Sequence, residues 1–355
     1  MKVLALNLPQ FHEVPENNEW WGQGFTEWTN VKKAKPVYEG HVQPMEPIDG
    51  YYYDLSKPED VIRQTELAKK YGVSGFVYFH YWYEGRKMLE KPCEILLAHP
   101  EADIEYCFCW ANHSWTRAWD GKEQDVLLKQ TYGGEDDWKA HLQYLLPFFK
   151  DERYIKRDNK PMFVIYNSSV IPDVDGMIAF WNEELKKEGF DGIYIVEYIS
   201  TKNPKPGSKL SQAVYEDEPM FTCRFEINNL EKFKRVVAKK TLSVDYQDYD
   251  RLWELILKKN RTYEGREIIQ GCFTAWDNSP RRGDKGSTII KGSDPEKFRK
   301  YFIQLINNPT RKDVSDEYVI INAWNEWGEG AILEPSVKDG YGYLEAVQYA
   351  LSQCK

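Results

Sequence analysis

Short runs of β-branched and aromatic residues alternate with longer amphipathic segments along this chain of 355 residues. The short runs predict buried strands, and apolar residues at helical spacing predict helices. Because the two patterns alternate, the chain is expected to form βα units around a parallel sheet. Eight strands are predicted, at residues 3–8, 75–80, 104–110, 161–166, 193–198, 212–215, 271–276 and 318–324.

Amphipathic helices are predicted between these strands and after the last one. The first is expected to begin after Ser56, as its N-cap, and to reach Gly72. Eight strands with a final helix favour a (β/α)8 TIM barrel over a doubly wound sheet, with enlarged loops on the C-terminal face. We expect residues 1–355 to form one such barrel domain. The helices are predicted at residues 58–71, 136–150, 174–188, 246–259, 294–307 and 342–352.

Composition excludes several classes of protein. With 42% hydrophobic and 29% charged residues, the chain is expected to be globular and soluble. A net charge of -9 argues against non-specific nucleic-acid binding, and no apolar run is long enough to span a membrane. The N-terminus is expected to be a strand rather than a signal peptide. None of the six cysteines forms a Cys-x-x-Cys, and Cys107 and Cys109 are expected in the core, so a cytoplasmic location is expected. The sequence does not indicate an oligomeric state.

Aromatic residues are abundant, at 15% of the chain. Core packing explains some of them, whereas a cleft for sugars would use flat aromatic faces against sugar rings. The distribution of tryptophan favours the cleft, because many of the 13 Trp lie at predicted strand ends and in the loops that follow. These are Trp20, Trp21, Trp28, Trp82, Trp110, Trp115, Trp119, Trp276, Trp324 and Trp327.

Nearly every predicted strand ends with an aromatic residue beside a hydrogen-bonding group. Barrel enzymes place their active sites at the C-terminal ends of the strands. Such a ring of residues suits a polyhydroxylated ligand, and we expect an oligosaccharide or polysaccharide substrate. The residues predicted to bind it are His12, Glu27, Trp28, Tyr78, His80, Trp82, Trp110, Asn112, His113, Trp115, Tyr198, Glu216, Trp276, Asn325 and Trp327.

Two carboxylates follow the last predicted strand, in Asn325-Glu326-Trp327-Gly328-Glu329-Gly330. Residues three apart share one side of a turn or helix start. Cleavage of a glycosidic bond commonly needs two carboxyl groups in different protonation states. Two solvated glutamates at a helix N-terminus would give the same spacing. Placement after the last strand favours catalysis, so Glu326 and Glu329 are the predicted catalytic pair.

Other chemistries have weaker support. His12, His80 and His113 end three predicted strands and could hold a metal, but no His-x-His or Glu-x-x-His occurs. The sequence also lacks a Gly-x-Ser-x-Gly, a phosphate-binding loop and a dinucleotide fingerprint. We therefore expect neither a metal nor a cofactor.

The sequence resembles the WbsX family over nearly its whole length, in several long motifs that occur in order. Proteins of this family are described as lipopolysaccharide O-antigen biosynthesis proteins or glycosyltransferases, and their domain is related to glycoside hydrolase family 99, whose fold is (β/α)8. The motifs are residues 8–12, 19–30, 78–83, 110–115, 276–281 and 325–330.

The resemblance implies a mechanism. Family 99 enzymes carry an Asn-Glu-Trp-x-Glu-Gly motif, which residues 325–330 match. Carried over to this sequence, Glu326 is the base that deprotonates the sugar 2-hydroxyl. A 1,2-anhydro sugar then forms, Glu329 acts as the acid and then as the base, and the configuration is retained. Two alternatives stay open: a nucleotide-sugar-dependent glycosyltransferase, and a non-catalytic glycan-binding barrel.

Overall fold

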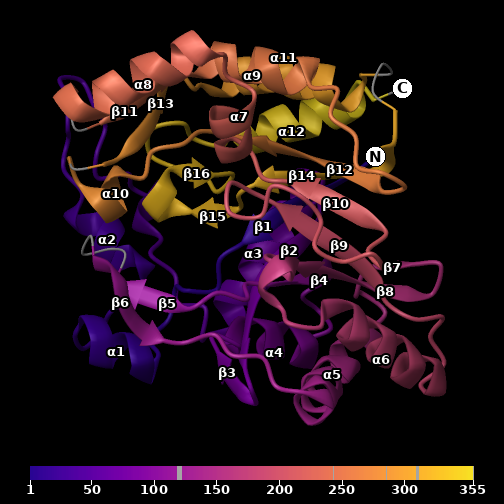
Figure 1. The fold of residues 1–355 in the computed structure, drawn as a ribbon. Helices are drawn as coiled ribbons and strands as arrows, with labels where there is room; N and C mark the ends of the chain where they lie inside the picture. The colour runs from indigo at the N-terminus through magenta and orange to yellow at the C-terminus, as the bar shows by residue number, and fades with distance from the viewer. Residues whose placement is uncertain (118–121, 243, 285, 309–311, 355) are drawn as a thin grey trace.

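Eight strands pair in parallel and close into a barrel in the computed structural model, which describes residues 1–117, 122–242, 244–284, 286–308 and 312–354 (Figure 1). The barrel closes where the first strand pairs with both the second and the last. The predicted (β/α)8 fold is confirmed. The barrel strands are β1 (Lys2–Asn7), β2 (Val73–Tyr83), β4 (Glu105–Trp110), β8 (Lys160–Ile165), β9 (Tyr194–Ile199), β10 (Ala213–Glu216), β12 (Glu267–Phe273) and β14 (Val314–Asn322).

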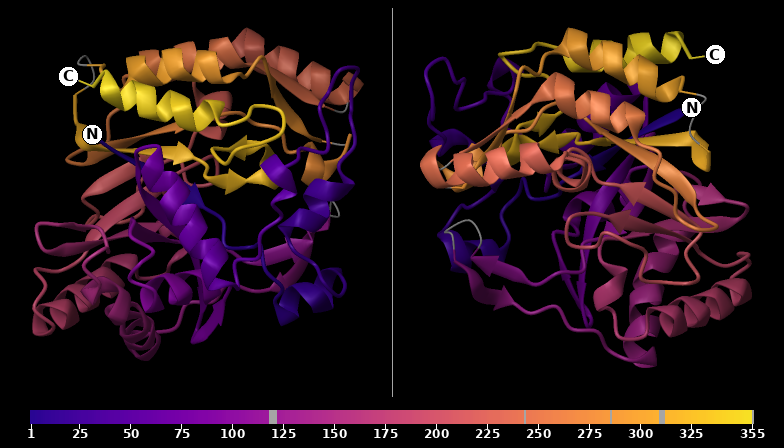
Figure 2. Two further views of the ribbon diagram at one scale, coloured as in Figure 1. Left: turned by 180° about the vertical axis from the view of Figure 1, so that it is seen from behind. Right: turned by 45° about the horizontal axis from the view of Figure 1, so that its top comes forward.

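Helices cover the outside of the barrel, and Figure 2 shows this layer from two further directions. They bury their apolar faces against the strands, as their amphipathic patterns predict. Between β9 and β10 the structure has a loop, residues 200–212, in place of a helix. The outer helices include α3 (Pro58–Lys70), α4 (Lys91–Ala98), α5 (Glu135–Lys150), α6 (Val174–Lys187), α9 (Tyr249–Lys258), α11 (Pro295–Ile306) and α12 (Gly342–Ser352).

Two details of the predicted helices are wrong. The N-cap of α3 is Lys57 rather than Ser56, because the helix starts directly at Pro58 with no side-chain cap. The helix predicted at residues 246–259 starts at Tyr249, because β11 (Asp245–Asp248) pairs with β13 (Thr288–Lys291).

The connections that leave the carboxyl ends of the strands carry additional elements, so the predicted loop enlargement is present. Their end of the barrel lies toward the left of Figure 1. The extra elements are α1 (Pro15–Trp21), α2 (Glu27–Lys33), η1 (Ile48–Gly50), β3 (Arg86–Met88), β5 (Trp115–Arg117), β6 (Lys122–Leu128), η3 (Ser168–Val170), α7 (Met220–Phe225), α8 (Asn229–Leu242), α10 (Ser279–Arg282), β15 (Asn325–Glu326), η4 (Trp327–Glu329) and β16 (Ala331–Ile332).

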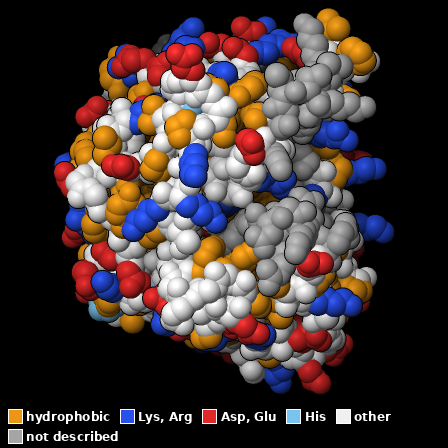
Figure 3. Space-filling model, turned by 90° about the vertical axis from the view of Figure 1, so that its left-hand side faces the viewer, with side chains coloured by type: hydrophobic (Ala, Val, Ile, Leu, Met, Phe, Trp, Pro, Cys, Tyr) orange, Lys and Arg blue, Asp and Glu red, His pale blue; other side chains and the backbone are white. Residues whose placement is uncertain are grey.

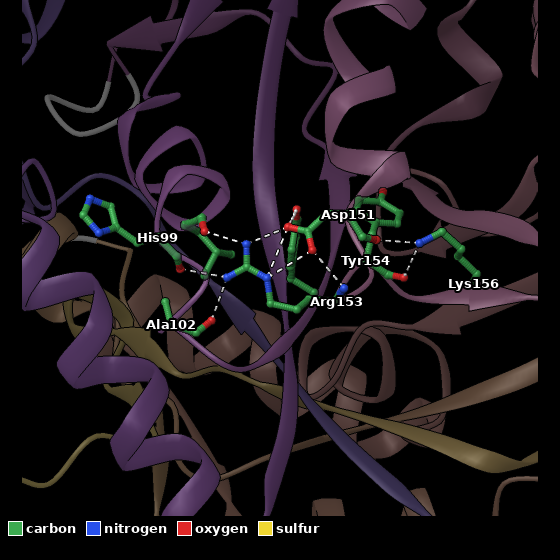
Figure 4. A network of polar contacts seen from close by, with 8 residues as sticks. His99, Ala102, Asp151, Arg153, Tyr154 and Lys156 are labelled. Carbon is green, nitrogen blue, oxygen red and sulfur yellow. Dashed lines mark hydrogen bonds and ion pairs between the residues drawn. The ribbon is translucent and has the colours of Figure 1, made fainter. Parts of the chain in front are cut away.

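Arg153 ties the opposite end of the barrel together, just before β7 (Lys156–Arg157) (Figure 4). Its guanidinium donates to the carbonyl oxygens of Leu96, His99 and Ala102 at 2.8–2.9 Å, and to the Asp151 carboxylate at 2.6 Å. These carbonyls end α4 or follow it, where helical carbonyls lack partners, so the arginine caps the helix. This network fixes the end of α4 to the connection between α5 and β7, at the end of the barrel opposite the rim that carries the extra loops.

All six cysteines are free, and both Cys107 and Cys109 are buried in the core as expected. Within the described residues, no helix is both long enough and apolar enough to cross a membrane.

Candidate active site

A cavity of about 790 Å³ opens at the C-terminal rim of the barrel. Its walls come from the ends of several strands and from the loops after them, so residues far apart in the sequence meet there. Figure 3 views this end of the molecule, where Lys and Arg side chains gather near the middle. The lining includes Leu6, Leu8, Gln10, Trp21, Phe79, Tyr81, His113, Trp115, Tyr166, Tyr198, Lys202, Asp217, Trp276, Arg281, Arg282, Glu326 and Glu329.

A tight turn after β14 presents the two predicted catalytic carboxylates to this cavity. Asn325 anchors the turn to the first strand: its Oδ1 accepts from the Leu8 N–H at 2.7 Å and its amide donates to the Leu8 carbonyl at 3.0 Å. The turn ends at Gly330, whose φ of +61° is left-handed and favours glycine. The Asp277 N–H then donates to the Glu329 carbonyl at 2.6 Å. The turn is therefore held from two strands.

Arg281, from α10, contacts both carboxylates at once. Its Nη2 donates to Glu326 at 2.7 Å and its Nη1 donates to Glu329 at 2.6 Å. Its third nitrogen, Nε, donates to Glu27 at 2.8 Å. One guanidinium thus joins three carboxylates, and charge-assisted hydrogen bonds of this kind fix the geometry of all four groups.

Only glycine fits at position 328 of the turn. A Cβ added there would lie 1.9 Å from Glu27 Oε1 and 2.7 Å from Arg281 Nε. Glu27 is fully buried, so it has little room to move away. The close passage of the backbone is what lets Glu27 reach Arg281 beneath the turn.

Burial and charge balance set the protonation of this cluster. Burial raises the pKa of Glu326, Arg281 opposes the rise, and Glu329 and Glu27 raise it further. Burial also raises the pKa of Glu27, again against Arg281. Burial alone would lower the pKa of Arg281, but the three carboxylates outweigh it and raise the pKa, so the guanidinium stays charged. One positive charge faces three carboxyl groups, so the cluster holds a proton more tightly than exposed glutamates do.

Six of the predicted site residues line the cavity: Glu326, Glu329, His113, Trp115, Tyr198 and Trp276. Trp115 belongs to the hairpin of β5 and β6, and Trp276 follows β12. Together with Trp21 from α1, they contribute three indole rings to the lining of the cavity that also holds the two carboxylates.

Three predicted residues on β2 lie on the wrong side of the strand for this cavity. Tyr78 packs against Phe76, His80 Nε2 lies 2.8 Å from His141 Nε2, and Trp82 donates to Asp137 at 2.9 Å. His141 and Asp137 belong to α5, so this face of β2 meets the outer helices. Side chains alternate along a strand, and the cavity is lined by Phe79 and Tyr81 instead.

Two more predicted residues, Trp110 and Asn112, stay in the wall behind the cavity. The Trp110 ring contacts His141 edge to face at 4.9 Å. The Asn112 amide donates to Tyr132 Oη and to the Asn167 carbonyl, at 2.9 Å and 2.7 Å. These bonds join two loops rather than leave the amide open to a ligand.

Glu216 points away from the cavity and accepts from the Lys259 ammonium at 2.8 Å. Both side chains are almost completely buried outside the barrel. The neighbouring residue, Asp217, lines the cavity in its place.

The remaining five predicted residues lie outside the cavity lining, and all but His12 belong to the turn or contact it or Arg281. His12 is buried, and burial lowers its pKa to about 4, with Lys91 adding to the fall. Trp28 donates to the Tyr53 carbonyl at 2.9 Å and packs on Trp327. Trp327 in turn donates to Glu334 at 2.6 Å. Glu27 accepts a hydrogen bond from Arg281, and Asn325 bonds the backbone of Leu8 directly after the first strand. The structure thus gives His12, Glu27, Trp28, Asn325 and Trp327 places outside the cavity lining.

Sequence reasoning missed several lining residues. Arg281 lies in the motif at residues 276–281, and Asp217 lies directly beside a predicted residue, so both carried a signal. Phe79 and Tyr81 could be predicted only if it were known which face of β2 points into the cavity. Trp119 lies outside the described residues.

The cavity has no obvious set of metal ligands. Across the described ranges, no group of three or more His, Cys, Asp or Glu side chains is arranged to hold a metal ion. His80 faces α5 while His113 lines the cavity, so the predicted histidines do not converge there.

An acidic pair and aromatic residues in one cavity, at the C-terminal rim of a (β/α)8 barrel, are typical of carbohydrate-active enzymes. Comparison with protein families identifies the class more closely. Residues 3–347 match the family described as glycosyltransferase WbsX, and the chain belongs to this family.

A similar protein is WxcX of Xanthomonas campestris pv. campestris, described as uncharacterized. It is 32% identical over 355 residues, which cover 99% of this chain and 50% of that protein. The chain therefore spans about half the length of the curated relatives it matches.

Solved structures with the same fold include a glycoside hydrolase-like protein, with a TM-score of 0.61 and 14% identity over 98% of this chain and 93% of that one. Another is a GH99 endo-α-mannosidase from Bacteroides thetaiotaomicron in complex with bis-tris propane. Its TM-score is 0.55 and its identity 14%, over 99% of this chain and 96% of that one. At this identity the likeness concerns the fold.

Proposed function

We propose that this chain is a retaining enzyme that cleaves or transfers glycosidic bonds in a bacterial polysaccharide. The observation that carries the proposal is the pair Glu326 and Glu329, held on one guanidinium and open to a cavity with aromatic walls. A binding module has no need for two carboxylates whose shared environment retains a proton. Trp115, Trp276, Tyr198 and His113 are the proposed sugar contacts among the predicted residues.

The proposed chemistry assigns one task to each carboxyl group. Glu326 takes the proton of the sugar 2-hydroxyl, and the 2-oxygen attacks the anomeric carbon. The glycosidic bond breaks, Glu329 protonates the leaving oxygen, and a 1,2-anhydro sugar remains. Glu329 then deprotonates a water or hydroxyl group, which opens the anhydro ring at the anomeric carbon while Glu326 returns the proton to the 2-oxygen. Two inversions give net retention.

The depth of the two carboxyl groups in the cavity supports this division. Glu326 lies deeper, and Arg281 stabilises the ionised form that a base requires, against the rise in pKa that burial and the neighbouring carboxylates cause. Glu329 is the more exposed of the two, with 24% of its side chain accessible against 10% for Glu326. It is therefore better placed to reach a leaving group in the cavity.

The test is a screen of purified bacterial O-polysaccharides and of α-mannan, with products identified by mass spectrometry. α-Mannan is included because a protein of the same fold is an endo-α-mannosidase. Glu326→Gln and Glu329→Gln should each lower turnover of the cleaved polysaccharide by about 10²–10⁴-fold. Glu59→Gln, at an exposed glutamate of α3, should leave turnover unchanged.

Unchanged turnover in Glu329→Gln would refute the assignment. The natural polysaccharide is needed for this comparison, because a good aryl leaving group needs no acid. Methylation of the sugar 2-hydroxyl separates mechanisms: a substrate so modified should not be cleaved if the 2-oxygen is the nucleophile.

A nucleotide-sugar-dependent glycosyltransferase is the second candidate, favoured by the family's name and by Lys202 and Arg282 in the cavity lining. These cations could meet a diphosphate. Calorimetric titration with nucleoside diphosphates distinguishes the two functions, since the glycosidase needs no such binding.

A further inference from the structure

Three consecutive acidic residues, Glu216 to Glu218, begin at the last residue of β10, and the middle one faces the opposite way from its neighbours. Glu216 and Glu218 both contact the buried Lys259 ammonium outside the barrel. Asp217 lines the cavity that also holds Glu326 and Glu329. The chain therefore places a third carboxyl group in the proposed active site, on the wall contributed by β10.

The contacts of Asp217 differ from those of the other two carboxyl groups. Tyr198 Oη donates to its Oδ1 at 2.9 Å. Its Oδ2 makes no hydrogen bond, and no cation pairs with it, anywhere in the described part of the chain. Glu326 and Glu329, by contrast, both rest on Arg281. Oδ2 is thus the carboxyl oxygen left for a ligand in the cavity.

The groups around Asp217 favour its neutral form. Burial raises the pKa of Asp217 to about 8, Tyr198 opposes the rise, and Glu218, Glu329 and Glu326 add to it. The other titratable groups that interact with it are the phenols of Tyr166, Tyr198 and Tyr215 and the thiol of Cys109, and these are uncharged at neutral pH. The cations in the cavity lining are Lys202, Arg281 and Arg282, and Arg281 already bonds three glutamates. A carboxylic acid in this state donates a hydrogen bond, whereas a carboxylate only accepts.

We propose that Asp217 contacts the glycan as a neutral carboxylic acid, with its Oδ2 hydroxyl donating a hydrogen bond to a sugar oxygen while Oδ1 accepts from Tyr198. The contact rests on the proposed function of the cavity. Asp217 transfers no proton in this role, so the acid and base steps stay with Glu329 and Glu326. Its effect is on how firmly the sugar is held, and therefore on KM more than on kcat.

Protonation is tested without a substrate, by ¹³C NMR of protein labelled at the aspartate carboxyl carbons. One resonance should titrate with a midpoint near pH 8 and be absent from Asp217→Asn. Tyr198→Phe should move this midpoint to higher pH, because the lost hydrogen bond stabilised the carboxylate. Asp191→Asn, at an exposed aspartate, should remove a different resonance and leave this one in place. A midpoint below about pH 6 for Asp217 would overturn the proposal.

The contact itself is tested with the polysaccharide that the screen identifies. Asparagine is a neutral isostere that keeps a donor, so Asp217→Asn should retain kcat and raise KM by less than tenfold. Asp217→Ala should raise KM further, by about 10–100-fold, since it removes the donor and leaves sugar and Tyr198 groups unpaired. A fall in kcat of about 10²-fold or more in Asp217→Asn would instead mean that Asp217 transfers a proton. Equal kinetics for wild type and Asp217→Ala would exclude contact.

The two proposals fail separately. If no glycan is turned over, or if Glu326→Gln and Glu329→Gln are fully active, the proposed function fails whatever the NMR midpoint is. If those variants are inactive while the aspartate midpoint is ordinary, the function stands and the role of Asp217 is lost.

Discussion

Replacing Gly328 by alanine tests whether the active-site turn, Glu27 and Arg281 form one tightly fitted unit. The new Cβ would lie 1.9 Å from Glu27 Oε1, whereas a carbon and an oxygen in contact are about 3.3 Å apart. The carboxylate or the turn must therefore shift by more than about 1 Å. Such a shift stretches the 2.8 Å bond from Arg281 Nε to Glu27 beyond hydrogen-bonding distance.

The energetic cost follows from the burial of Glu27, which is 0% exposed. Breaking a buried ion pair so that one charge is left without its partner costs about 3–5 kcal/mol. Arg281 keeps its bonds to Glu326 and Glu329, so we expect the lower end, about 3 kcal/mol off the free energy of unfolding. Because Arg281 also positions the proposed catalytic pair, turnover should fall by about 10²-fold.

Urea denaturation followed by tryptophan fluorescence measures the stability loss. Gly134→Ala is the matched control, because its Cβ would meet nothing within 4 Å and its φ is −86°. The control should stay within about 1 kcal/mol of wild type. In a Glu27→Ala background, Gly328→Ala should cost markedly less than in wild type, since the clashing carboxylate is gone. A stability of Gly328→Ala equal to that of Gly134→Ala would refute the close fit.

Three further predictions concern charge and burial. Arg281→Gln should lower the free energy of unfolding by about 3–5 kcal/mol at pH 7, and by less at pH 5, where the carboxyl groups it leaves behind take up protons; urea denaturation at both pH values checks this. Burial lowers the pKa of His80 to about 3 and that of His141 below its ordinary value, so both resist protonation in the folded state. The contribution of these neutral histidines to the free energy of unfolding is fully present above about pH 6.5 and is lost as pH falls. Acidification to pH 5 should therefore lower the free energy of unfolding by about 2 kcal/mol through His80. Replacing both histidines by phenylalanine should flatten the pH dependence of the unfolding free energy. Glu334→Gln should stay within about 1 kcal/mol of wild type at neutral pH because an acceptor for Trp327 remains, whereas Glu334→Ala should lose about 1–3 kcal/mol, as measured by thermal or urea unfolding.

The strands of the barrel could be predicted because they are buried on both faces. Each is a short, nearly continuous apolar run, and each predicted run overlaps an observed strand. Because both faces are buried, the sequence does not show which side of the strand each side chain points to. On β2 the sequence from Tyr78 to Trp82 is aromatic on both sides, so polarity does not tell which residues enter the barrel. The predicted set therefore fell on the outer face, against α5.

The acidic run at the end of β10 shows the same limit at the level of one residue. Glu216, Asp217 and Glu218 are equally acidic, and β10, which ends at Glu216, has only four residues, all buried. They differ in their contacts, because Lys259, about 40 residues further along the chain, forms ion pairs with both glutamates and not with Asp217. The direction of each carboxylate is thus decided by a tertiary ion pair that no local pattern encodes.

Long-range pairing also explains why the sequence indicated the two glutamates of the turn but not their partner, Arg281. Glu326 and Glu329 lie three residues apart, so their proximity is local and visible in the sequence. Glu27 and Arg281 are separated by 254 positions and meet only once the barrel has closed. Yet Arg281 bonds both glutamates of the turn, and Gly328 has to be glycine because Glu27 passes beneath it. The charge balance of the turn therefore depends on closure of the barrel. A variant that folds but does not bring the loop with Glu27 against Arg281 should keep both glutamates and lose the charge balance that the proposed reaction needs.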